Sequence, residues 1–106
     1  MNIPGVFDFT VSNIGADGIQ YYTGMLEPER LDANGMRTGK AFDITLDHLR
    51  QRTTISTFMW IGGAPHNWEV ATVIKGEVFA ESEVKGLLEK YGLIKTAETV
   101  RKEITQ

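Results

Sequence analysis

The spacing of apolar residues changes once along this chain, and that change constrains the fold more than any single residue. Residues 6–11 alternate apolar and polar side chains, as a half-buried strand does. In the last third, four apolar residues from Val84 to Tyr91 fall at the i, i+3, i+4, i+7 spacing of an amphipathic helix. Strands that precede helices in this way predict an α+β fold with a mainly antiparallel sheet.

Five segments carry the composition of strands, and turn residues separate them. Asp17-Gly18 supplies the positive φ of a tight hairpin, and Asn34-Gly35 is a second strong turn signal. The stretch 53–61 is rich in β-branched and aromatic residues, which favour strands. The predicted strands are 6–11, 19–26, 40–44, 53–61 and 68–74.

Helices are predicted at three places. Thr45 is a suitable N-cap for a helix of about two turns after the third strand. Ser82 is placed to cap the amphipathic helix, and Gly92 is placed to end it. A further helix is predicted to begin near Thr96, so that two C-terminal helices pack on one face of a sheet of about five strands.

The length of 106 residues suits one domain, 1–106, with mainly strands in 1–79 and helices in 80–106. The pattern predicts a core drawn from both parts. Its expected members are Phe7, Phe9, Val11, Tyr21, Phe42, Ile44, Trp60, Val70, Val73, Leu87, Leu88 and Val100.

Several classes of chemistry lack the residues they need. The chain has no cysteine, and its two histidines, His48 and His66, stand apart from any acidic cluster, so we expect no metal site and no cofactor. His48 follows Asp47, but neighbours on a helix point about a quarter-turn apart, so we expect an exposed helical histidine and no catalytic residue. With neither a signal peptide nor a stretch of ~20 apolar residues, we expect a cytoplasmic protein that contacts no membrane.

The segment 62–68 is the most unusual stretch and the first candidate site. Two glycines and a proline precede a histidine and an amide, and Trp60 and Trp68 flank the segment. Tryptophan and arginine often carry interface energy, which predicts a binding loop. The alternative interpretation is that both tryptophans pack in the core and the loop only connects two strands. The predicted partner-binding residues are Trp60, His66, Asn67, Trp68, Arg50 and Arg52.

A second interpretation is nucleic-acid binding. The C-terminal stretch 89–102 has the glycine turn and capped second helix of a helix-turn-helix, and Lys95, Arg101 and Lys102 are placed to touch phosphates. An ordinary antiparallel helix pair explains the same pattern. The other route is a platform of aromatic strands flanked by Arg37, Lys40, Arg50 and Arg52. A formal net charge of -3 argues against a broad basic footprint.

The sequence therefore favours a small protein-binding module, such as an adaptor, an accessory subunit or an inhibitor of a larger protein, with no catalysis of its own. Nucleic-acid binding is the alternative. Self-association through an exposed strand is also left open.

Overall fold

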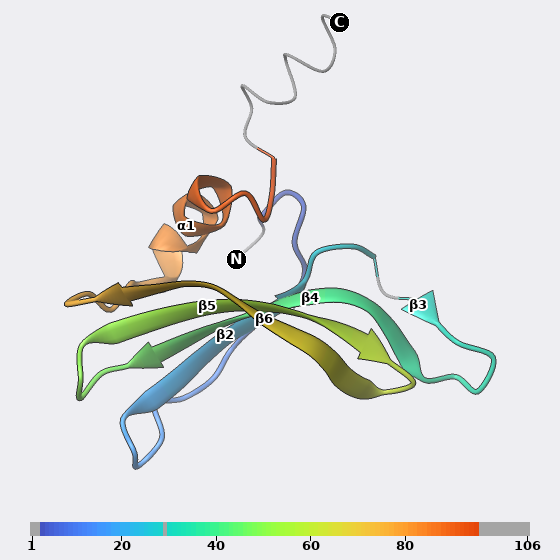
Figure 1. Ribbon diagram of the computed structural model, residues 1–106, viewed down its shortest axis with the longest axis horizontal. Coiled ribbons are helices and arrows are strands. Elements are labelled where there is room, and N and C mark those ends of the chain that lie inside the picture. The colour runs from blue at the N-terminus through green and yellow to red at the C-terminus, as the bar shows by residue number, and fades with distance from the viewer. Residues whose placement is uncertain (1–2, 29, 96–106) are drawn as a thin grey trace, which may run out of the picture.

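The computed structural model describes residues 3–28 and 30–95 of the chain, and its main element is a six-stranded sheet (Figure 1). All neighbouring strands are antiparallel, in the order β1-β2-β4-β5-β6, and the short β3 pairs with one end of β4. This confirms the mainly antiparallel sheet of an α+β fold, with six strands in place of about five. The strands are β1 (Phe7–Val11), β2 (Ile19–Met25), β3 (Arg30–Leu31), β4 (Arg37–Asp47), β5 (Arg52–Ile61) and β6 (Ala64–Lys75).

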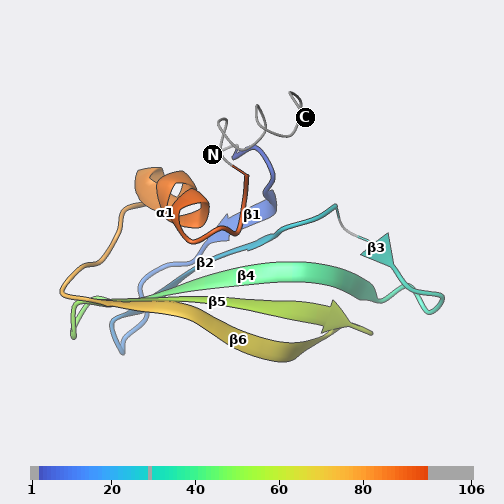
Figure 2. The ribbon, with the colours of Figure 1, turned by 45° about the horizontal axis from the view of Figure 1, so that its top comes forward.

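One helical segment follows the sheet and packs on one of its faces. A single turn of 3-10 helix, η1 (Glu81–Glu83), leads into the α-helix α1 (Val84–Lys90). Figures 1 and 2 show α1 on one side of the sheet, with no helix or strand in the described chain on the opposite side. We call these two sides the covered face and the open face.

The main core lies between α1 and the covered face. Phe42, Ile44 and Leu88 are fully buried there, and Leu87 is also buried, as predicted. Phe9 is partly buried against this core. Its other buried members are Ile3, Val6, Tyr22, Leu46, Ile55, Val84 and Ile94.

Five of the predicted core residues are exposed, and for those on the open face the reason is that alternation identifies two faces without saying which one a helix covers. Tyr21 and Tyr22 do point to opposite faces, but Tyr22 is the buried one and Tyr21 is 44% exposed. The other exposed members are Phe7, Val11, Val70 and Val73. Trp60 is half-buried in a smaller cluster, and Val100 lies outside the described residues.

The predicted helix after Thr45 is wrong. β4 continues to Asp47, and Thr45 donates its hydroxyl hydrogen to the Oδ1 of Asp43 at 2.6 Å instead of capping a helix. The Asp47 carboxylate then accepts hydrogen bonds from the backbone N–H groups of Leu49 and Arg50, at 3.2 and 2.9 Å. Because aspartate satisfies these amides locally, the chain turns directly into β5.

The predicted long loop at 62–68 is also wrong. Gly62 and Gly63 alone form the turn, with φ of 60° and 82°, and β6 begins at Ala64. Two positive φ values are what a two-residue hairpin turn demands. Asn67 takes a positive φ of 55° within β6, where the register between β5 and β6 shifts, so this residue belongs to a β-bulge.

The C-terminal predictions are confirmed in part. Gly92 has a φ of 75°, and the N–H of Leu93 bonds back to the carbonyl of Leu88, so the helix ends as predicted. Ser82 does not cap the helix, because it lies inside η1 and no side chain caps either helical element. The second helix, predicted from Thr96, lies outside the described residues. No helix in residues 3–28 and 30–95 has the length and apolar character to cross a lipid bilayer.

Candidate protein-binding face

The open face carries apolar side chains although nothing covers it in the described chain. Side chains alternate along each strand, so the residues in register with Met25 share its side of the sheet. An antiparallel sheet that faces water on one side is normally polar there. Here Trp68, Val70 and Val73 are 53%, 63% and 46% exposed.

An aromatic cluster occupies one end of this face, and we define it as Phe58, Trp60 and Trp68. The Phe58 and Trp68 rings are stacked, with centroids 4.1 Å apart and planes 24° apart. The Trp60 and Phe58 rings form a T-shaped pair with a centroid distance of 5.5 Å. The guanidinium carbon of Arg37 lies 5.8 Å from the centroid of the Trp60 ring, within cation–π range.

Buried residues support the aromatic cluster from within the sheet. Met25 and Ala41 are almost fully buried beside Phe58, which is itself buried. A hollow of about 160 Å³ opens next to them and is lined in part by Thr10, Thr23 and Trp60. The cluster therefore combines fixed rings with an exposed indole, which is the arrangement of an interface anchor.

The middle of the open face is polar. Asp43 lies in register with Thr23 on β2 and with Ser56 on β5. Burial raises the pKa of the Asp43 carboxyl group, and the hydrogen bond from Thr45 opposes this shift. Small hydroxyl side chains thus surround a half-buried carboxyl group between the two ends of the face.

The structure brings together two of the six predicted partner-binding residues. Trp60 and Trp68 belong to the aromatic cluster, whereas Arg50 and Arg52 lie at the far end of the sheet. Eight residue steps of about 3.3 Å along β5 separate Arg52 from Trp60, or roughly 26 Å. Arg50 forms an ion pair with Asp47 at 3.0 Å, and Arg52 lies 3.9 Å from the same carboxylate.

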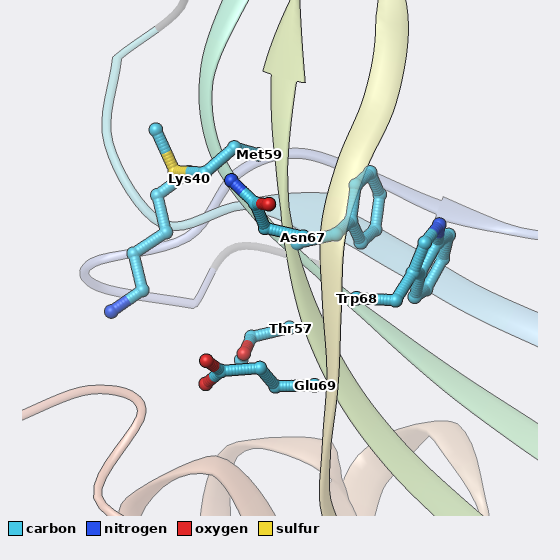
Figure 3. Close-up of a pocket in the computed structure, with 7 residues that line it drawn as sticks. Lys40, Thr57, Met59, Asn67, Trp68 and Glu69 are labelled. Atoms are coloured by element: carbon cyan, nitrogen blue, oxygen red, sulfur yellow. The ribbon is translucent and has the colours of Figure 1, made fainter.

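His66 and Asn67 belong to the other side of the sheet. His66 is in register with Met59. Figure 3 shows Met59, Asn67 and Glu69 on one side of β5 and β6, with Trp68 on the other. A hollow of about 540 Å³ is lined by Lys40 and Asn67 and also by Phe58 and Trp68. His66 and Asn67 therefore lie on the side of the sheet opposite Trp68, but Asn67 and Trp68 line the same hollow.

Phe58 is a site residue that the prediction missed. Its signal was present, because period-two alternation places residues 58 and 60 on one face. The stacking partner Trp68 could not be assigned in the same way, since the bulge at Asn67 shifts the alternation of β6.

The residues considered for nucleic-acid binding, catalysis or metal binding do not come together in one site. Arg101 and Lys102 lie outside the described residues, and Lys95 is exposed at the end of the described chain. His48 lies in the turn after β4, where its Nε2 is 2.9 Å from the Oε1 of Gln20, and not on an exposed helix. Within residues 3–28 and 30–95, no group of three or more His, Cys, Asp or Glu side chains is arranged to hold a metal ion.

Comparison of the chain with protein-family models, with curated proteins and with solved structures gave no match. Function is therefore inferred from the residues and their geometry alone.

Proposed function

We propose that this protein is a protein-binding module whose contact surface is the open face of the sheet, and that it has no catalysis of its own. The observation that most supports this proposal is the aromatic cluster, in which Phe58 and Trp60 are held by ring contacts while Trp68 remains 53% exposed. An exposed indole beside fixed rings offers a large contact area at little entropic cost. An adaptor, an accessory subunit or an inhibitor would each use such a surface.

Nucleic-acid binding is the second candidate, and the Arg37 guanidinium over Trp60 favours it. Its support is weaker, because phosphates need several cations beside the rings. Lys40 lines the hollow of about 540 Å³ together with Phe58 and Trp68, but Arg50 and Arg52 lie at the far end of the sheet beside Asp47. Asp43 places an acidic group in the middle of the open face.

Capture from an extract of the native host, after nuclease treatment, tests the protein-binding proposal with two variants of the same strand. Trp68→Ala should lose the captured protein, whereas His66→Ala should retain it because His66, in register with Met59, lies on the opposite side of the sheet. Equal retention by both variants would remove the open face from consideration. A salt-sensitive mobility shift with single-stranded DNA, lost in Trp68→Ala, would favour the nucleic-acid candidate instead.

A further inference from the structure

The open face has the size of a dimer interface. It spans the five strands β1, β2, β4, β5 and β6. At spacings of about 4.8 Å between strands and about 3.3 Å per residue over eight residue steps, its flat footprint is roughly 500 Å². Because side chains project from the sheet, the accessible area of the face is larger than this footprint. It approaches the ~800 Å² that each partner contributes to a standard interface. A single helix or peptide would cover only part of this face, whereas another sheet of equal size would cover it all.

The two ends of the face are complementary to each other on β5 and β6. The row Thr23, Asp43, Ser56 and Val70 crosses the middle of the sheet from β2 to β6. On one side of this row lies the aromatic cluster. On the other side of the middle row, the register pairs place Tyr21, Thr45, Thr54 and Val73 in one row. On β5 and β6, large rings thus lie on one side of the middle row and smaller side chains on the other, whereas on β2 the exposed ring of Tyr21 and the buried Met25 lie on opposite sides of it.

A two-fold axis above the middle row, parallel to the sheet and perpendicular to its strands, would place the rings of Phe58 and Trp68 of one copy over the smaller Thr54 and Val73 of the other. Packed sheets of a sandwich interdigitate side chains in this way at a separation of about 10 Å. The same operation would bring the cationic side chain of Arg52 over Trp60 of the second copy, since these residues end opposite halves of β5.

We propose that the partner of the open face is a second copy of this chain, and that two sheets pack face to face with α1 on each outer side. This inference rests on the proposed protein-binding function and names its partner. The four resulting layers would cover the apolar surface that the single chain leaves exposed.

Sedimentation equilibrium of the full chain tests this proposal. We expect a monomer–dimer equilibrium with a dissociation constant on the order of micromolar. Val70→Glu should raise this constant by at least about 100-fold, because it buries a charge without a partner. Leu49→Glu is the matched control, since Leu49 is an exposed apolar residue in the turn after β4 and should leave the constant unchanged.

A third variant guards against simple misfolding. Asp43→Asn should lower the dissociation constant, because two Asp43 carboxyl groups would meet near the axis and an amide costs less to bury there. Circular dichroism should show all variants folded.

Two results would overturn the dimer: a wild-type chain that stays monomeric up to roughly 1 mM, or Glu variants that weaken it equally. If the wild type is monomeric but Trp68→Ala still loses a captured host protein, the second copy is excluded and the proposed function stands.

Discussion

At the scale of single residues, two glycines have opposite expected effects on substitution. A Cβ on Gly24 would lie 2.8 Å from the Cε1 of Phe42 and 3.0 Å from the Cγ1 of Val6, whereas a Cβ on Gly86 would meet nothing within 4 Å. Gly24→Ala should therefore lower the free energy of unfolding by about 1–3 kcal/mol through overpacking. Gly86→Ala should raise it by about 0.5–1 kcal/mol, since alanine favours the helix. Urea unfolding measures both, and a Gly24→Ala variant at least as stable as the wild type would contradict the packing around Gly24.

The Asp47 carboxylate provides a pH-dependent contribution to stability. The backbone N–H of Arg50 holds the pKa of Asp47 below its usual range, assisted by the Arg50 guanidinium and the N–H of Leu49. A carboxyl group with a lowered pKa in the folded state stabilises the fold above its unfolded pKa, and this contribution is lost as pH falls through the folded pKa. Asp47→Asn should therefore lower the melting temperature at pH 7, and the difference should shrink in acid. A difference that is constant from pH 7 to pH 2 would contradict this role.

At the scale of elements, α1 is stabilised by its packing. The helix has seven residues, which is too short to be stable alone, but Val84, Leu87 and Leu88 are buried against the sheet. Leu88→Ala should lower the free energy of unfolding by about 2–5 kcal/mol. Lys85→Ala, on the exposed side of the same helix, should change it by less than about 0.5 kcal/mol. Urea unfolding of both variants checks this, and a Leu88→Ala loss as small as the control would show that α1 does not hold the core.

The spacing of apolar residues and the identity of the turn residues were sufficient to predict most of the helices and strands. The Asp17-Gly18 hairpin, the strand before Gly62, the later part of β6 and the end of α1 at Gly92 were all present in local residue patterns. The segment after Thr45 was misjudged because threonine caps helices and also suits strands. What decided it was the hydrogen bonding of Asp47 to the turn amides, which the pattern of apolar residues does not report.

Local sequence patterns could not show which residues of a strand lie on the covered face of the sheet and which on the open face. Alternation placed Tyr21 and Tyr22 on opposite sides, yet only the position of α1 determines that Tyr22 is buried. Prediction of the candidate site also required knowing the face on which each side chain lies. His66, Asn67 and Trp68 are adjacent in sequence, but a strand sends neighbours to opposite faces and a bulge at Asn67 resets the order.

At the scale of the whole molecule, the architecture is a helix on one face of a sheet and exposed apolar surface on the other. Edge-to-edge pairing through β6 is disfavoured by Pro65, which lacks an amide hydrogen, and by two irregularities in its register. Pairing through the open face meets neither obstacle. At β6, the sheet is therefore better suited to stacking than to extension.

If two chains unfold together from a stacked dimer, thermal stability must depend on protein concentration. Mass action favours the dimer as concentration rises, so the melting temperature should increase by roughly 3 °C for each tenfold increase while the dimer is populated. Differential scanning calorimetry across a hundredfold range of concentration measures this slope. Val70→Glu should melt at one temperature throughout, whereas Leu49→Glu should keep the slope of the wild type, because only Val70 lies on the open face. A wild-type melting temperature that does not move with concentration would show that the chain unfolds as a monomer and that the open face is not covered by a second copy.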